Sequence, residues 1–218
     1  QSSDDPHATL SAIREEYPTV EDFERSFPTV CFSLATGVGK TRLMGAFVAY
    51  LHLAHGIRNF FVLAPSLTIY NKLVADFTPG TSKYVFTGIA EFATRSPALI
   101  TGDNFEQRPQ VLDLFERDDV VVNIFNIAKF NVRTKDSRKI RRLSEFLGQS
   151  YFDYLAGLDD LVLLMDEAHR YRADTSMASI EDLKPILGLE VTATPQIEAG
   201  RGAGRFKNII YDYPLSNA

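Results

Sequence analysis

A glycine-rich turn between an apolar strand and an apolar helix constrains this chain more than any other feature. Residues 30–35 are apolar except for Ser33 and predict a strand. The turn after them reads Thr36, Gly37, Val38, Gly39, Lys40 and Thr41. In a phosphate-binding loop, glycines let backbone N–H groups surround phosphate oxygens, and the next helix directs its positive end at the anion. The turn therefore predicts an ATP site. Lys40 would contact the β- and γ-phosphates, Thr41 would bind Mg²⁺, and Arg42 joins Thr36–Thr41 as a cofactor-binding candidate. The competing interpretation is a chance glycine-rich turn.

A second signal is a pair of carboxylates at the end of another apolar run. Residues 161–165 are all apolar, and Asp166, Glu167, Ala168 and His169 follow. We expect Asp166 to hold Mg²⁺ and Glu167 to act as general base on the attacking water. His169 is a candidate to sense the nucleotide. An acidic surface turn is the alternative interpretation, but the position of these residues downstream of a phosphate loop argues against it.

Strand-like and helix-like segments alternate along the chain. Alternation of this kind predicts an α/β fold with a mostly parallel sheet and helices on both faces, with ligands at the carboxyl ends of the strands. Ser66 follows Pro65 and is a plausible N-cap for the helix predicted at 66–77. The predicted strands are 30–35, 60–64, 84–86, 120–125, 161–165, 189–192 and 208–213, and the predicted helices are 10–16, 40–54, 66–77 and 137–147.

The order and spacing of these motifs resemble superfamily-2 helicases and translocases. Thr192-Ala193-Thr194-Pro195 matches motif III, and Ala64-Pro65-Ser66-Leu67 stands where motif Ia belongs. Leu34 replaces the first glycine of the full phosphate-loop pattern, as is common in this superfamily. Arg170 after His169 fits the Asp-Glu-Ala-His-Arg form of restriction motors. The chain looks most like the ATPase lobe of type III restriction enzyme helicase (Res) subunits.

The resemblance implies a RecA-like P-loop NTPase fold, with residues 1–27 as an N-terminal extension and 28–215 as the first ATP-binding lobe. It implies ATP and Mg²⁺ as cofactors. It also implies that Thr192 and Thr194 couple nucleotide state to the nucleic-acid track, with hydroxyls that bond to the 166–169 loop. Without that context, β-branched residues would merely suit a strand end.

Two departures from the family pattern affect function. No glutamine motif for adenine precedes the phosphate loop; Phe27 or Tyr17 is a candidate to stack on the base, with a core position as the competing interpretation. Motifs IV to VI are also absent, including the arginine finger of a second RecA-like lobe, which contributes about a thousandfold or more. We therefore expect this lobe to bind ATP and hydrolyse it poorly by itself.

The expected nucleic-acid partner is double-stranded DNA. The net charge of −5 gives no global attraction to nucleic acid, so contacts must be local. Ser66 and Asn126 are the candidates by motif position. A basic cluster could add phosphate contacts, or it could be a solvated helix face. This cluster comprises Arg133, Lys135, Arg138, Lys139, Arg141 and Arg142.

Other functions remain open at this stage. One is an RNA helicase lobe, against which the form of motif Ia counts. A nucleotide-dependent switch is another, against which the intact Glu167 counts. A transporter ATPase would carry a Leu-Ser-Gly-Gly-Gln signature, which is absent. The single cysteine, Cys31, excludes an internal disulfide, and no apolar run reaches membrane-spanning length, so we expect a cytoplasmic location.

Overall fold

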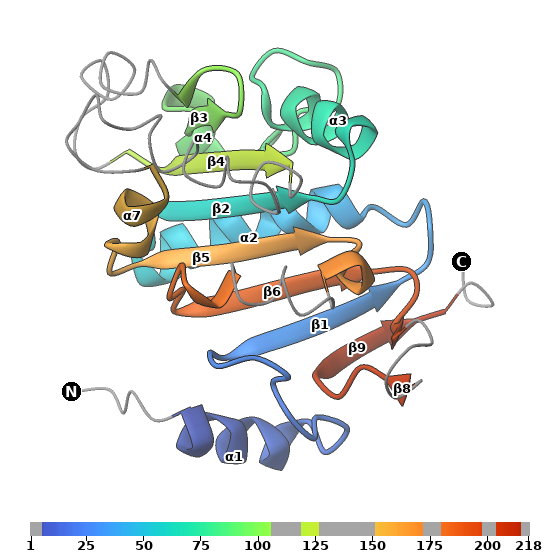
Figure 1. The fold of residues 1–218 in the computed structure, drawn as a ribbon. Coiled ribbons are helices and arrows are strands. Elements are labelled where there is room, and N and C mark those ends of the chain that lie inside the picture. The colour runs from blue at the N-terminus through green and yellow to red at the C-terminus, as the bar shows by residue number, and fades with distance from the viewer. Residues whose placement is uncertain (1–5, 106–118, 127–150, 172–179, 198–203, 215–218) are drawn as a thin grey trace, which may run out of the picture.

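Seven parallel strands form the centre of this molecule. The computed structural model describes residues 6–105, 119–126, 151–171, 180–197 and 204–214. All strands of the sheet point the same way (Figure 1), in the order β3-β4-β2-β5-β6-β1-β9. The strands are β1 (Thr29–Leu34), β2 (Asn59–Ala64), β3 (Ala98–Thr101), β4 (Val121–Asn126), β5 (Leu161–Asp166), β6 (Leu187–Thr192) and β9 (Ile209–Tyr213). A small antiparallel pair, β7 (Gln196–Ile197) and β8 (Gly204–Arg205), lies outside the sheet.

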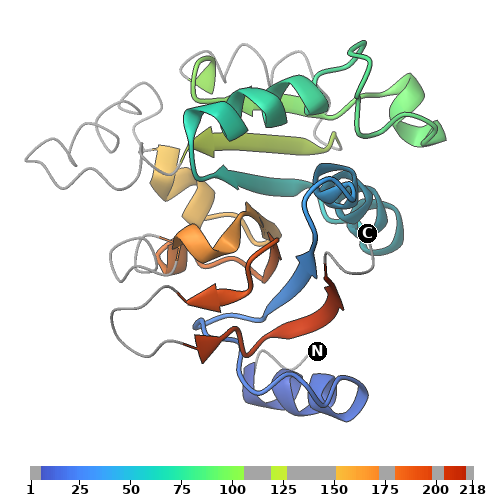
Figure 2. The same ribbon diagram turned by 90° about the vertical axis from the view of Figure 1, so that its right-hand side faces the viewer.

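Helices cover both faces of the sheet. Phe60 and Val62 of β2 pack in one apolar cluster with α2 (Lys40–His55) and α3 (Leu67–Phe77). The alternate residues, Phe61 and Leu63, pack in a second cluster with α7 (Tyr151–Ala156). Figure 2 shows α2 and α7 on opposite sides of the sheet. Both faces of the central strands are therefore buried, which confirms the predicted α/β class.

The ends of the two long helices follow local rules. Ser66 caps α3, since its hydroxyl accepts a hydrogen bond from the Ile69 N–H at 3.4 Å, as predicted. Gly56 ends α2 at φ 70°, a left-handed conformation that glycine adopts without strain. The predicted helix 10–16 is present as the longer α1 (Pro6–Glu16).

The predicted secondary structure differs from the structure at one strand and omits several short elements. The predicted strand at 84–86 lies in turns, where Val85 and Phe86 are buried and the Val85 N–H donates to the Asp76 carbonyl. These apolar residues pack in the core, and a run of three residues is too short to show whether it forms a strand. Neither β3 nor the short α4 (Ala90–Thr94) nor α7 was predicted. The predicted helix at 137–147 lies outside the described residues.

The segment before β1 is packed onto the sheet. Val20, Phe23 and Phe27 are buried. Phe27 belongs to the core cluster of α7, so the core interpretation of this ring holds and it is not free to stack on a base. Tyr17 is partly exposed. The boundary between residues 27 and 28 stays a prediction.

A buried ion pair joins this segment to the sheet. Arg25 donates from Nε (3.0 Å) and Nη2 (2.6 Å) to Oε1 of Glu190, and both side chains are 0% exposed. Asn208 donates from Nδ2 to the other carboxylate oxygen at 3.0 Å. The network ties the N-terminal segment and the start of β9 to β6, the strand that leads to Thr192.

Within the part of the chain that the structure describes, no helix is long and apolar enough to cross a membrane.

Candidate nucleotide site

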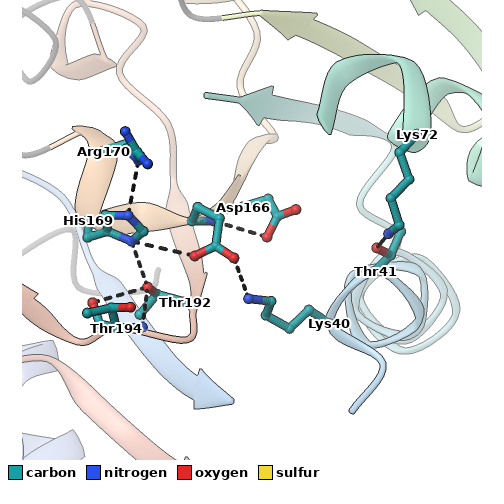
Figure 3. Close-up of polar contacts among 9 residues, drawn as sticks. Lys40, Thr41, Lys72, Asp166, His169, Arg170, Thr192 and Thr194 are labelled. Carbon is teal, nitrogen blue, oxygen red and sulfur yellow. Dashed lines mark hydrogen bonds and ion pairs between the residues drawn. The ribbon is translucent and has the colours of Figure 1, made fainter. Parts of the chain in front are cut away.

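The parallel sheet brings the ends of three strands to one edge. β6 lies between β5 and β1, with Val191 paired to Asp166 and Thr192 paired to Ser33. The phosphate loop follows β1, the carboxylates end β5, and the threonines end β6. Three motifs far apart in the sequence therefore share one site (Figure 3).

The phosphate loop has the geometry of an anion cradle. Gly37 and Gly39 have φ of 90° and 100°, which only glycine adopts readily. The loop is exposed at Thr36, Gly37, Val38 and Gly39. Gly39 caps α2 without a side chain, so no side-chain acceptor satisfies the first N–H groups of the helix. These amides suit phosphate oxygens.

Lys40 and Glu167 form an ion pair across the site. The Lys40 ammonium contacts Oε1 of Glu167, with the two side chains 12% and 22% exposed. Glu167 has φ 52°, a left-handed conformation that costs a non-glycine residue free energy and that is concentrated at functional sites. This strained residue connects β5 to the short helix η4 (Ala168–Tyr171). The predicted phosphate-binding cation and the predicted general base thus lie in direct contact.

Asp166 is buried and held by the loop that follows it. Its Oδ1 accepts a hydrogen bond from the Glu167 N–H at 3.0 Å. Burial raises the pKa of Asp166 above its usual value and the charge of Glu167 raises it further, while Lys40 and Lys72 oppose the rise. Burial and the charge of Glu167 therefore disfavour the Asp166 carboxylate, and a bound cation would stabilise it.

We expect Asp166→Asn to stabilise the metal-free fold at pH 7. A carboxyl group whose folded pKa is raised favours the fold when protonated; this contribution is complete below the ordinary value of 3.8 and is lost as pH rises through the folded value. The asparagine keeps the Oδ1 acceptor and carries no charge. In EDTA, its midpoint of thermal unfolding should exceed that of the wild type by about 2–4 °C, the shift that about 1 kcal/mol produces in a chain of this size. The difference should shrink towards pH 3.8. An equal difference at every pH would contradict the assignment.

A hydrogen-bonded chain links the carboxylate loop to β6. His169 Nδ1 lies 3.1 Å from Oγ1 of Thr192 and 3.5 Å from Oε2 of Glu167. Arg170 donates from Nε to His169 Nε2 at 3.1 Å, so the ring proton is on Nδ1, facing Thr192 and Glu167. Thr192 Oγ1 in turn donates to the Thr194 carbonyl and accepts from the Thr194 N–H. The Thr192 hydroxyl therefore makes the bond predicted between motif III and the 166–169 loop, whereas Thr194 joins the network through its backbone N–H and carbonyl and not through its hydroxyl as predicted.

Lys72 of α3 is a member of the site that the sequence did not reveal. Its Nζ donates to Oγ1 of Thr41 at 2.6 Å and lies 3.3 Å from Oδ2 of Asp76. The spacing of four residues between Lys72 and Asp76 is a recognisable helical pair. Only the folded chain shows that this lysine reaches the predicted metal ligand.

The remaining candidates lie on the same edge but form no part of this network. Ser66 follows β2, and Asn126 ends β4, where it pairs with Ala64. Arg42 is exposed on α2. The predicted basic cluster, residues 133–142, lies outside the described residues. A cavity of about 510 Å³ beside the phosphate loop is lined by residues that include Thr36, Thr194 and Tyr213.

Comparison with known proteins identifies the family. The family described as type III restriction enzyme, res subunit, matches residues 10–197. No curated protein sequence matches this chain. Among solved structures, a nuclease-deletion mutant of the Type ISP restriction-modification enzyme LlaGI, in complex with a DNA substrate mimic, shares the fold with a TM-score of 0.52 and 11% identity. That match covers 99% of this chain, which spans 20% of the LlaGI chain. The predicted resemblance is confirmed: this chain belongs to the type III restriction enzyme res subunit family.

Proposed function

We propose that this chain is the ATP-hydrolysing lobe of a superfamily-2 motor that acts on double-stranded DNA. ATP hydrolysis in general follows from the family. The observation that carries the proposal is the continuous chain of contacts from Lys40 through Glu167 and His169 to Thr192 and Thr194. It joins a phosphate-binding residue to the end of the neighbouring strand, as a motor requires.

The residues present fit ATP and Mg²⁺. The uncapped amides of α2 and the Lys40 ammonium suit phosphate oxygens. The hydroxyl of Thr41 and the carboxylate of Asp166 are oxygen ligands of the kind that Mg²⁺ prefers. Mg²⁺ would neutralise negative charge on the phosphates.

Each side chain has a distinct part in the proposed reaction. Lys40 leaves Glu167 for the phosphates, because an anionic phosphate competes with the carboxylate for the ammonium. Glu167, once released, accepts a proton from the attacking water. His169 holds the second oxygen of Glu167 and the hydroxyl of Thr192 through one ring nitrogen, so movement of Glu167 alters the bond to Thr192. This coupling would transmit the nucleotide state to β6.

The proposed motor needs a second RecA-like lobe. The described site contains the phosphate loop and both carboxylates, and Arg170 is engaged with His169. An arginine supplied from another lobe would stabilise the transition state. The cavity between Thr36 and Thr194 opens beside the phosphate loop and would receive part of that lobe or of the nucleotide.

The proposed DNA track runs along the carboxyl edge of β2 and β4. Ser66 and the neighbouring Asn126 offer polar groups there, suited to sequence-independent backbone contacts. The basic residues at 133–142 follow β4 in the sequence and would add charge. The solved LlaGI mutant was in complex with a DNA substrate mimic, which is consistent with a DNA partner.

The deciding experiment is steady-state ATPase of the chain joined to its proposed second lobe. Double-stranded DNA, single-stranded DNA, RNA and no polymer are compared. We expect stimulation by double-stranded DNA. Stimulation by RNA alone would move the function to RNA helicases, and nucleotide binding with no stimulation would favour a switch. The chain alone should turn over poorly; robust turnover would refute the need for a second lobe.

Lys40→Ala is expected to weaken ATP binding by roughly 10- to 100-fold, the scale of hydrogen bonds between charged groups. It removes the ammonium that the phosphates would take from Glu167. Fluorescence titration with a labelled ATP analogue measures this, and Arg14→Ala, on α1, is a control that removes one positive charge from another region. Unchanged affinity in Lys40→Ala would show that the loop does not bind phosphate.

A further inference from the structure

Lys72 is a second cation at the nucleotide site, and its partner there is unexpected. Its ammonium holds the Thr41 hydroxyl at 2.6 Å (Figure 3), and this oxygen is the proposed Mg²⁺ ligand. Thr41 is buried, so its hydroxyl is reached from few directions. An ammonium and Mg²⁺ on the same oxygen would repel each other strongly, so the two exclude one another.

Lys72 also contacts a second partner, Asp76. Asp76, one helical turn further along α3, has a side chain that is 10% exposed and lies 3.3 Å from the Lys72 ammonium. The Lys72 side chain is 56% exposed, so it is free to change rotamer at small cost. An ammonium released from Thr41 could therefore remain paired with a carboxylate.

We propose that Lys72 bridges the Thr41 hydroxyl and Asp76 until Mg²⁺ arrives with the nucleotide, and that it then releases Thr41 and keeps only Asp76. The inference rests on the proposed ATP site. Lys72 is a positioning residue that sets the Mg²⁺ concentration at which the site fills, which we call the Mg²⁺ demand. Its ammonium orients the Thr41 hydroxyl and balances the charge of Asp166 until the metal takes its place. The presence of the metal would thereby change a contact made by α3, the helix that Ser66 caps.

The test measures the Mg²⁺ concentration that gives half-maximal enhancement of binding of a labelled ATP analogue. In the full chain, Lys72→Ala should lower this concentration about three- to fivefold, the scale of an exposed ion pair, because Mg²⁺ no longer displaces an ammonium. Asp76→Asn should raise this Mg²⁺ concentration by a similar factor, because Lys72 released from Thr41 would have no carboxylate partner left on α3. Lys83→Ala, which removes one positive charge from an exposed position after α3, should have no effect.

The double variant separates a switch from a general charge effect. With Lys72 already replaced, Asp76→Asn should no longer change the Mg²⁺ demand, because the two residues act on the same step. An equal effect of Asp76→Asn in both backgrounds, or no shift in Lys72→Ala, would overturn the proposal. Thermal unfolding checks that all variants are folded. If the wild type binds no nucleotide at any Mg²⁺ concentration, the proposed function fails as well; nucleotide binding with an unaltered Mg²⁺ response refutes Lys72 alone.

Discussion

Glu167→Gln should reduce the rate of ATP hydrolysis by about 100- to 10,000-fold, the usual contribution of a general base. The amide cannot accept the proton of the attacking water. The same change removes the negative charge that pairs with Lys40. Lys40 is then free to meet the phosphates, so affinity for ATP should be unchanged or tighter while turnover falls. Single-turnover hydrolysis and equilibrium binding, measured on the two-lobe protein with DNA, separate the two effects.

Glu91→Gln is the matched control for Glu167→Gln. Glu91 is exposed on α4, away from the Lys40–Glu167 network, and the substitution makes the same chemical change. It should leave the hydrolysis rate within about twofold of the wild type, because an exposed surface charge contributes little. If Glu167→Gln kept full turnover, Asp166 or another group would have to supply the base.

Arg25→Met should lower the free energy of unfolding by about 3–5 kcal/mol, the cost of breaking a buried ion pair from one side. The Glu190 carboxylate is fully buried and would lose both of its bonds to Arg25, while its bond to Asn208 stays. Equilibrium unfolding in urea gives the value, with the slope against urea checked for constancy.

The double variant Arg25→Met with Glu190→Met separates pairing from packing. Because no charge is left unpaired, it should recover a large part of the lost stability. A double variant as unstable as the sum of the single ones would show that the two charges do not act as a pair. Arg205→Met, which breaks the ion pair with Asp212 whose side chains are 58% and 37% exposed, should cost much less.

Local sequence determined most of the strands and the chemistry at their ends. The phosphate loop needs only its own glycines and the helix that follows, and Ser66 caps α3 through a bond three residues away. The all-apolar run before Asp166 predicts a buried strand because a parallel strand covered on both faces has no polar side. Interactions of this range lie within one element, so a pattern of neighbouring residues is enough to indicate them.

Short elements escaped sequence interpretation for the same reason. The four residues of β3 are too few to show a period. Residues 84–86 are apolar because they fill the core beside α3, which looks the same as a strand in one dimension. Phe27 shows the same ambiguity: a ring before the phosphate loop could face a base or the core, and packing beside α7 decided for the core.

The sequence by itself thus determined the fold class, the order of the motifs and the residue types that suit ATP and Mg²⁺. The family resemblance implied a contact between motif III and the 166–169 loop, but the tertiary structure decided which atoms of these residues meet. The strand order puts β6 between β5 and β1, so that His169 reaches Thr192 across 23 positions of sequence. It also brings Lys72 to Thr41 and Arg25 to Glu190, 31 and 165 positions apart. Such contacts depend on the relative placement of whole elements, which no local pattern encodes.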